Sequence, residues 1–375
     1  MSHISSARIL HICKVYLPVR GGVQKVVHSI TSLSKQHTHY VMTSGEDGAI
    51  AEQTLNGTCI TRSRSYLEVA SMPIAPRMIG KIIQMAKKCH IICVHYPFPL
   101  ADLALAMIIR LPPMVVYWHS NIVAQKKLKW LTYPLIYLTL KRAAAIVVTS
   151  ERMIDNSKLL TRFRAKVKII PYGLPTLSES PADSTSCTNS YNNSDYFVLV
   201  GRHVSYKGID IAIRALQDIE THLVIVGNGP LYEQHKLLSQ TIGVCHKVSF
   251  EQNASDDEVK RLIQGSTALI MPSIMPNEAF GLVQLEAMRL GKPVINTSLA
   301  STVPMIARHQ KEGLTIEPND PDALAQAMIQ IASDKSLATT LGNNGYQRFN
   351  EKFTDIKFKL ALDALFEELL ALKQQ

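Results

Sequence analysis

The sequence predicts an α/β protein made of two doubly wound, Rossmann-like domains that face each other across a cleft. Short β-branched runs alternate with longer segments of helical periodicity, a rhythm that places helices on both faces of a mainly parallel sheet. The rhythm stops once, at residues 176–195, where Ser, Thr, Asn and Asp replace large apolar residues. It then starts again, so each side of this linker is expected to form its own sheet.

The expected elements follow the chain in order. The predicted strands of the first half are 7–15, 38–43, 90–95, 114–119, 144–149 and 166–171, and the predicted helices between them include 22–35, 78–88 and 125–142. Those of the second half are strands 196–200, 222–226, 247–250, 268–271 and 293–296 and helices 209–216, 231–242, 256–264 and 281–290. Only helices are expected after that. The predicted domains are therefore 1–175 and 196–354, joined by the linker 176–195.

Length and composition exclude several classes of protein. The 375 residues are too many for one ordinary domain, and 46% hydrophobic residues supply two cores. The most apolar region, 98–118, is interrupted by Asp102, Arg110 and Pro112-Pro113, so no membrane-spanning helix is expected. No apolar secretory segment follows Arg8. The six scattered cysteines form no CxxC pair, which favours reduced thiols and a cytoplasmic location.

The charge is distributed unevenly between the halves. Residues 1–180 contain 23 Lys and Arg against 8 Asp and Glu, while the remainder contains 17 against 22. The first half therefore carries +15 and the second −5. A basic first domain suits an anionic membrane surface, a lipid diphosphate or nucleic acid, although solubility alone is an alternative explanation.

The loop Gly201-Arg-His-Val-Ser-Tyr-Lys-Gly208 opens the second half directly after a predicted strand. Its two glycines permit tight turns, and Arg202 and Lys207 between them can point toward one spot above the sheet. Two cations at that spot suit a diphosphate. A solvated loop with incidental charges is the alternative.

A second motif lies at the start of the predicted helix 281–290. The backbone N–H groups of Phe280, Gly281 and Leu282 are expected to form an anion site at the helix N-terminus. Glu286 is placed to accept hydrogen bonds from a ribose, and Glu278 from sugar hydroxyls. Alternatively, Glu278 is a carboxylate favoured by the helix dipole. An unpaired Glu286 among apolar neighbours would be costly.

Three further sites are expected at strand ends. Gly227-Asn-Gly229 begins a GxGxxG pattern, but Tyr232 replaces its third glycine, so a dinucleotide fingerprint is poorly supported. Gly21-Gly22 after the first strand forms a backbone nest for a phosphate or sugar. His119 ends a strand and is weighed equally as a functional or a satisfied buried histidine, with His95 a weaker second candidate.

Two other segments have competing interpretations. Residues 125–142 combine basic ends with a Trp, Tyr and Leu body, which favours contact with a membrane interface over an ordinary core-facing helix. Asp320-Pro-Asp322 matches a DxD metal pattern, but it directly precedes a helical segment. Asp320 is therefore interpreted as a helix N-cap.

Together and in chain order, these motifs resemble those of retaining glycosyltransferases of family 4, which have the two-domain GT-B fold. The residues that carry the resemblance are Gly21-Gly22, His119, Ile170-Pro-Tyr-Gly173, Gly201-Arg202 with Lys207-Gly208, Gly227-Asn-Gly-Pro230, and Glu278 with Glu286. Within the family, the segments around His95, His119 and Gly201 resemble bacterial mannosyl- and rhamnosyltransferases that build surface polysaccharides. Gln24 departs from the Glu of many members. The resemblance also implies that the last helix, 355–375, packs back onto the first domain.

The resemblance implies a metal-independent, cofactor-free hexosyltransferase that retains the anomeric configuration. Its expected donor is GDP-mannose and its expected acceptor a lipid-linked sugar or oligosaccharide of O-antigen, capsule or exopolysaccharide. Arg202, Lys207 and the N–H groups at 280–282 are expected to stabilise the leaving diphosphate. Glu278 is expected to hold the donor sugar, Glu286 the ribose, and His119 the sugar near its anomeric carbon.

The remaining expectations concern partners and alternatives. Gly21, Gly22, Gly201, Gly227, Gly229 and Gly281 are expected to let the donor approach the backbone. The basic first domain is expected to touch the inner face of the cell membrane, and no nucleic acid is expected as a partner. A sugar-nucleotide epimerase or phosphorylase-like enzyme of the same fold and a non-catalytic nucleotide-sugar-binding or assembly protein are the alternatives. An NAD dehydrogenase is the least favoured.

Overall fold

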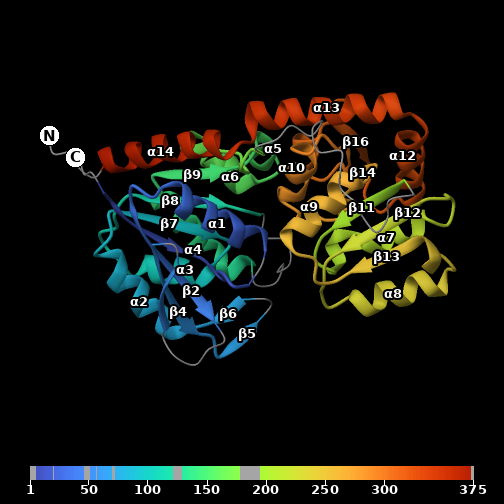
Figure 1. Cartoon of the computed structure of the whole chain (residues 1–375). Coiled ribbons are helices and arrows are strands. Elements are labelled where there is room, and N and C mark those ends of the chain that lie inside the picture. The colour runs from blue at the N-terminus through green and yellow to red at the C-terminus, as the bar shows by residue number, and fades with distance from the viewer. Residues whose placement is uncertain are drawn as a thin grey trace. The chain divides into compact units, whose positions relative to one another are not determined.

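The computed structural model describes residues 6–19, 21–45, 51–55, 57–69, 72–120, 129–177 and 195–372. It divides the chain into two units (Figure 1). The first contains Met1–Tyr172 and Ile356–Gln375, and the second contains Gly173–Asp355. Each unit has its own largely parallel sheet with helices against it, so the predicted class of two Rossmann-like α/β domains is confirmed. Most of the predicted linker 176–195 lies outside the described residues.

The first unit contains an eight-stranded sheet in the order β10-β9-β8-β7-β1-β2-β4-β3. Its strands are β1 (Arg8–Ile12), β2 (Thr38–Gly45), β3 (Ala51–Leu55), β4 (Thr58–Arg64), β7 (Ile91–Tyr96), β8 (Met114–Trp118), β9 (Ala145–Val148) and β10 (Val167–Ile169). All neighbours are parallel except β3, which is antiparallel to β4. A separate hairpin joins β5 (Leu67–Val69) to β6 (Met72–Ile74). The helices of this unit are α1 (Gly22–Leu33), α2 (Pro76–Ala86), α3 (Pro99–Ala106), α4 (Lys129–Arg142), α5 (Glu151–Asp155), α6 (Lys158–Arg162), the 3-10 turn η1 (Arg164–Lys166) and α14 (Asp355–Leu372).

The central strands form as predicted because they are apolar on both faces. Every residue of β7 and β8 is buried, which a parallel sheet covered on both sides requires. Strands β3 to β6 and helix α3 were not predicted. The polar residues of β3 hide its strand pattern, and α3 is short and lies inside the most apolar region of the chain. Residues 125–128 of the predicted helix 125–142 lie outside the described part of the chain, and α4 begins after them.

The second unit contains a six-stranded parallel sheet in the order β13-β12-β11-β14-β15-β16. Its strands are β11 (Tyr196–Val200), β12 (His222–Val226), β13 (Val248–Glu251), β14 (Ala268–Ile270), β15 (Val294–Thr297) and β16 (Gly313–Ile316). Its helices are the 3-10 turns η3 (Ser205–Lys207) and η4 (Cys245–Lys247), with α7 (Ile209–Ala215), α8 (Tyr232–Thr241), α9 (Asp256–Gly265), α10 (Leu282–Met288), α11 (Val303–Ile306), α12 (Pro321–Ser333) and α13 (Lys335–Lys352).

Two sequence predictions are decided near the end of this unit. The expectation of helices alone after residue 296 was wrong, because β16 adds an edge strand of only four residues. The interpretation of Asp320 as a helix cap is confirmed. Its Oδ1 accepts a hydrogen bond from the backbone N–H of Ala323 at 2.8 Å, at the start of α12.

Both sheets reverse their strand order at one point. In the first unit the reversal lies between β1 and β7, and in the second it lies between β11 and β14. Loops that follow the two strands at such a reversal diverge to opposite faces of the sheet and leave a crevice at its carboxyl edge. This topology directs attention to the loops after β1, β7, β11 and β14.

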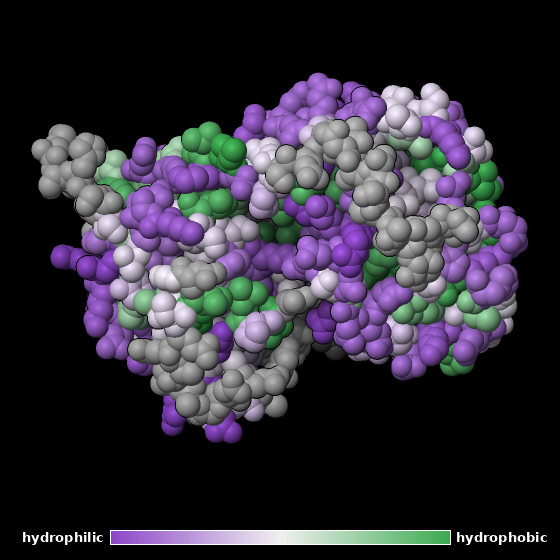
Figure 2. Space-filling view, viewed as in Figure 1, coloured by the Kyte–Doolittle hydropathy of each residue, from purple (hydrophilic) through white to green (hydrophobic). Residues whose placement is uncertain are grey.

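Helix α14 packs on the first unit, although it follows the second unit in sequence. His37 makes an edge contact with the ring of Phe366, with ring centroids 5.8 Å apart. Lys168 and Glu368 form an exposed ion pair of 3.1 Å, and Gln36 donates to Asp363 at 2.7 Å. None of the described helices combines the length and apolar character that crossing a membrane requires. Figure 2 shows that hydrophilic residues cover much of the visible face, with apolar groups between them.

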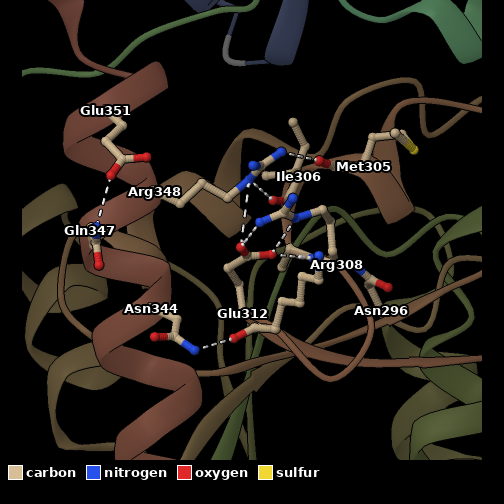
Figure 3. A network of polar contacts seen from close by, with 11 residues as sticks. Asn296, Met305, Ile306, Arg308, Glu312, Asn344, Gln347, Arg348 and Glu351 are labelled. Carbon is tan, nitrogen blue, oxygen red and sulfur yellow. Dashed lines mark hydrogen bonds and ion pairs between the residues drawn. The ribbon is translucent and has the colours of Figure 1, made fainter.

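A buried carboxylate fastens α13 to the rest of the second unit (Figure 3). Glu312 is 2% exposed and accepts hydrogen bonds from the backbone and the guanidinium of Arg308. Arg348 of α13 lies 4.0 Å from the same carboxylate and donates to the carbonyls of Ile306 and Met305. The carboxylate is therefore the anionic centre that keeps both arginines in place.

Replacing this carboxylate should weaken the second unit. We expect Glu312→Gln to lower its free energy of unfolding by about 2–3 kcal/mol, because two cations lose their buried counter-charge. Gln347→Ala is the matched control. It removes a 2.9 Å hydrogen bond to Glu351 on the exposed side of α13. It should cost no more than about 0.5 kcal/mol. Equal effects in urea unfolding would contradict a special role for Glu312.

Candidate functional site

The two loops at the strand reversal of the second unit are joined by an ion pair. Lys207 ends the loop after β11, and Glu278 lies in the loop after β14. The Lys207 Nζ is 2.6 Å from the Glu278 Oε2, and the two side chains are only 15% and 10% exposed. Topology thus brings together two residues that are 71 positions apart in sequence and that the motifs had singled out separately.

The ion pair keeps Lys207 charged despite its burial. Burial alone would lower the pKa of Lys207, but the adjacent Glu278 carboxylate more than offsets this, so the pKa lies above its ordinary value. The hydroxyl of Ser273 also approaches the Glu278 Oε2 at 3.5 Å. The loop therefore holds a permanent, sheltered cation at the carboxyl edge of the sheet.

Arg202 and Tyr206 complete the polar group around this pair. Burial raises the pKa of Tyr206, the Glu278 charge raises it further, and the charges of Lys207 and Arg202 oppose the increase. All three charges consequently act on one hydroxyl. The side chain of Arg202 is exposed, whereas that of Lys207 is sheltered. That both cations point toward one spot above the sheet stays a prediction.

Glycines let the loops after β11 and β12 touch. Gly227 has φ +141°, and a Cβ atom there would lie 2.1 Å from the carbonyl oxygen of Gly201. Gly229, with φ +158°, would clash in the same way with the backbone of His203. Since no side chain fits at either position, the GxG of residues 227–229 serves close packing of two backbone turns.

The start of α10 differs from the prediction. The helix begins at Leu282, with Gly281 as its N-cap in the left-handed conformation (φ 75°) and without a side-chain cap. Phe280 therefore precedes the helix, and the anion site predicted at the N–H groups of Phe280, Gly281 and Leu282 stays a prediction. The turn is held instead by Gln284, which donates to the Phe280 carbonyl at 3.2 Å and accepts from Asn296 at 2.8 Å.

Glu286 lies on α10 and is half-buried. Burial lowers the pKa of the neighbouring Arg289, and the Glu286 charge opposes that shift. An electrostatic link between the two residues therefore exists on this helix. The ribose contact predicted for Glu286 remains a prediction.

The predicted residues of the first unit form a separate group. Gly21 is the N-cap of α1 in an extended conformation, and its backbone carbonyl accepts from the Lys25 N–H at 3.0 Å. A Cβ at Gly21 would lie 2.5 Å from the Oε1 of Gln24, so the side chain of Gln24 covers this glycine. Gly22 has open space around its α-carbon. The turn is thus accessible at Gly22 and closed at Gly21.

His119 is more tightly held than its strand-end position suggests. It is 6% exposed, and both ring nitrogens are engaged. Its Nε2 lies 2.9 Å from the Nδ1 of His95, and its Nδ1 lies 2.6 Å from the hydroxyl of Tyr172. Burial lowers the pKa of His119 to about 3, so the ring is neutral at physiological pH.

Several residues of these sites were not predicted from the sequence. They are Tyr206, Ser273, Gln284, Asn296, His203, His235, Tyr172, His11 and His39. His203 lies within the Gly201–Gly208 loop and pairs with His235 through their Nδ1 atoms at 2.9 Å. The one signal in the sequence for these residues was the repeated placement of histidine on buried strands. Their partners come from distant segments and are not visible in the sequence.

Comparisons with known proteins agree over nearly the whole chain. The model of the family described as Glycosyltransferase Family 4 matches residues 20–176, and that described as Glycosyl transferases group 1 matches residues 186–348. The D-rhamnosyltransferase WbpZ of Pseudomonas aeruginosa is 29% identical over 353 residues, which cover 92% of each chain. The O-antigen chain mannosyltransferase C of Escherichia coli is 28% identical over 92% of this chain and 94% of its own.

A solved structure shares the fold. Anabaena HepE, crystallised in complex with UDP-glucose, superposes with a TM-score of 0.76 over 96% of this chain and 100% of its own, at 16% identity. At that identity the likeness shows the fold alone. The recognition made from the ordered motifs is confirmed by the family matches and the curated relatives.

The glycine packing gives a first prediction for the site. We expect Gly227→Ala to destabilise the second unit by about 2 kcal/mol or more and to abolish nucleotide binding, because the new Cβ meets the Gly201 carbonyl. Gly243→Ala is the matched control, since Gly243 has φ +79° but open surroundings. It should cost only the backbone strain of about 1 kcal/mol. Thermal unfolding and calorimetric titration with nucleoside diphosphates check both outcomes.

The buried histidines give a second prediction, on pH. His11, His39, His95 and His119 have lowered pKa values in the folded unit, about 4 for His39 and about 3 for His119, against 6.5 when unfolded. Below pH 6.5 the unfolded state therefore binds more protons, and stability falls with falling pH. Burial raises the pKa of Asp102 to about 6, so near pH 5.5 the folded state binds a proton there that the unfolded state does not. Asp102 therefore offsets about one of the protons taken up by the histidines on unfolding. The net loss should approach about 4 kcal/mol per pH unit near pH 5.5.

Urea unfolding at pH 7, 6 and 5 checks this slope. Trp118, which is buried in the first unit, reports its unfolding by fluorescence. His39→Asn should reduce the slope by about 1.4 kcal/mol per pH unit, whereas His246→Asn, at an exposed position of the second unit, should not. A pH-independent stability would show that the histidines are charged in the folded protein.

Proposed function

Because the chain belongs to the family 4 glycosyltransferases, we propose that its second unit binds a nucleoside diphosphate sugar and that the enzyme transfers the hexose with retention of anomeric configuration. The sheltered Lys207–Glu278 pair carries this proposal. It joins a sheltered cation and a carboxylate side by side at the strand reversal, where doubly wound sheets bind ligands. A donor with a diphosphate next to a polyhydroxylated ring matches both groups.

The cations stabilise the charge that develops on the leaving group. Departure of the nucleoside diphosphate places negative charge on its phosphate oxygens, and preorganised cations in a sheltered site stabilise that charge most effectively. Lys207 meets this requirement because the adjacent Glu278 carboxylate stabilises its charge despite burial. Arg202, which is exposed, adds a second cation. No metal ion is required for this step in the proposal.

Retention follows from a front-face reaction. The acceptor hydroxyl attacks the anomeric carbon from the side on which the leaving diphosphate departs, and the leaving phosphate oxygen takes the hydroxyl proton. The new glycosidic bond forms as the bond to the phosphate breaks, so no protein base is needed. Glu278 holds the sugar hydroxyls during this exchange, and Glu286 holds the ribose.

The donor and acceptor are proposed from the relatives. A D-rhamnosyltransferase and an O-antigen chain mannosyltransferase match 92% of this chain. We therefore assign GDP-mannose as the donor and a lipid-linked sugar or oligosaccharide of a bacterial surface polysaccharide as the acceptor. The net charge of +15 on residues 1–180 supports contact with the cytoplasmic face of the membrane that carries such acceptors.

Donor turnover tests the proposal directly. Incubation with a panel of nucleotide sugars should release nucleoside diphosphate from GDP-mannose, faster with a crude lipid-linked acceptor and equally with a chelator. Lys207→Ala should lower the rate by about 10²–10³, since one preorganised cation is lost, and Glu278→Ala should have a comparable effect. Lys236→Ala, at an exposed position on α8, is the matched control and should retain full activity.

The result that would refute the proposal is specific. Tight donor binding without release, even with lipid extracts from the source organism, would indicate a binding protein. Release from a different nucleotide sugar would keep the reaction class and replace the donor.

Membrane contact is tested separately. The purified protein should sediment with anionic phosphatidylglycerol vesicles at low salt and dissociate as salt rises, because the attraction is electrostatic. Vesicles of phosphatidylcholine alone are the control and should leave it in the supernatant. Failure to bind anionic vesicles at low salt would remove the membrane from the proposal.

A further inference from the structure

Four buried histidines form one diagonal row across the sheet of the first unit. In the parallel registers His39 of β2 pairs with Ile9, His11 of β1 pairs with Cys93, and His95 of β7 pairs with Tyr117. The next histidine of the row always lies two residues beyond the paired position, at His11, His95 and His119. Since side chains two residues apart share a face, all four rings lie on the same side of the sheet.

The rings are linked nitrogen to nitrogen. The His39 Nδ1 is 3.0 Å from the His11 Nε2, the His11 Nδ1 is 3.1 Å from the His95 Nε2, and the His95 Nδ1 is 2.9 Å from the His119 Nε2. One end of the row meets the backbone carbonyl of Ser34, 2.9 Å from the His39 Nε2. The other end meets the hydroxyl of Tyr172, 2.6 Å from the His119 Nδ1.

The carbonyl at the first end fixes the direction of every hydrogen bond. A carbonyl oxygen only accepts, so the Nε2 of His39 must carry hydrogen. A neutral ring carries one hydrogen, so the Nδ1 of His39 is bare and accepts from the Nε2–H of His11. The same reasoning applies at each step, and it ends with a bare Nδ1 on His119 that accepts from the Tyr172 hydroxyl.

The rings are neutral because they are buried. None of the four is more than 6% exposed. Burial lowers the pKa of each ring, and the neighbouring histidines lower the pKa of His11 and His95 further. The row does not carry protons to solvent through its Ser34 end, because an amide carbonyl oxygen accepts a hydrogen bond but does not take up a proton near neutral pH. Its physical effect is therefore orientation.

We propose that His39, His11 and His95 are positioning residues that fix the tautomer of His119, so that His119 presents a bare Nδ1 and binds a sugar through a hydroxyl that donates to it. This rests on the proposed function, sugar transfer, and on the sugar contact that the resemblance implies for His119. In the structure the Tyr172 hydroxyl lies 2.6 Å from this Nδ1 and donates to it. A sugar hydroxyl has the same chemistry and takes its place, whereas a ligand group that only accepts hydrogen bonds is excluded.

The surroundings keep the row rigid. The ring of His95 stacks on that of His119 with centroids 5.1 Å apart and on Tyr117 at 5.0 Å. Tyr172 makes an edge contact with Phe358 of α14, which supports its ring. These apolar contacts hold ring positions without setting the tautomer, which only the hydrogen bonds determine.

The test compares two variants of His11, which lies two rings from His119 in the row. His11→Leu removes the acceptor for the His95 Nε2–H and ends the constraint from Ser34. His11→Asn is the matched control, because its carboxamide oxygen accepts from His95 in place of Nδ1. Two-bond ¹H–¹⁵N spectra of histidine-labelled protein report the tautomers, with His119 identified by its loss in His119→Asn. Transfer kinetics report the consequence for the sugar.

In the wild type, all four rings should carry hydrogen on Nε2, and His119 should have a bare Nδ1. In His11→Leu the His119 signals should shift toward a mixture of tautomers, with kcat/KM lowered about three- to tenfold, the effect of losing one neutral hydrogen bond. His11→Asn should restore the wild-type tautomer and most of the activity. Hydrogen on Nδ1 of any ring in the wild type would overturn the proposal, even if neither variant folds.

The kinetic and spectroscopic results separate this proposal from the proposed function. Absence of transfer from every nucleotide sugar would refute the function, while the spectra would still decide the tautomer. Normal transfer by a His11→Leu protein whose tautomers have changed would refute the positioning role and leave the function intact.

Discussion

Parallel strands impose one constraint on both units, because all the strands that run parallel end at the same edge of their sheet. The loops that carry Gly21, His119, Lys207 and Glu278 all follow such strands. Burial of β7, β8, β11 and β12 between helices makes the sheets rigid supports for these loops. The chemistry of the chain therefore gathers at two edges, one in each unit, instead of being spread along the sequence.

Close backbone packing turns this edge into a site in the second unit. The turns at Gly201 and Gly227 touch, since a Cβ at Gly227 would lie 2.1 Å from the Gly201 carbonyl oxygen. Their contact leaves Lys207 lying over Gly201 and within 2.6 Å of Glu278. Burying either charge alone would be costly, so the pair is stable only as a pair. A donor that replaces some of these contacts finds the cation and carboxylate already in place.

In the first unit, the same sheet geometry allows a row of polar side chains to be buried. Four neutral imidazoles lie on the face shared with Cys13 and Val41, which pack against α1. Each ring is hydrogen-bonded to the next. At one end of the row, His39 donates to the backbone carbonyl of Ser34 at the C-terminus of α1. Buried polar groups in such a row are tolerated because none is left without a partner. The row thereby connects a helix end to the strand-end histidine that the proposed reaction uses.

The sequence by itself determined the two-unit α/β fold, the central strands, the Asp320 cap and the motif residues Arg202, Lys207, Glu278 and His119. These depend on periodicity and local chemistry, which neighbouring residues express. Strands β3, β4 and β16, the start of α10 at Leu282, and the partners of each motif were decided only by tertiary structure. These three strands are too short or too polar to show a period, and hydrogen-bond partners 24 to 84 residues apart leave no local signal.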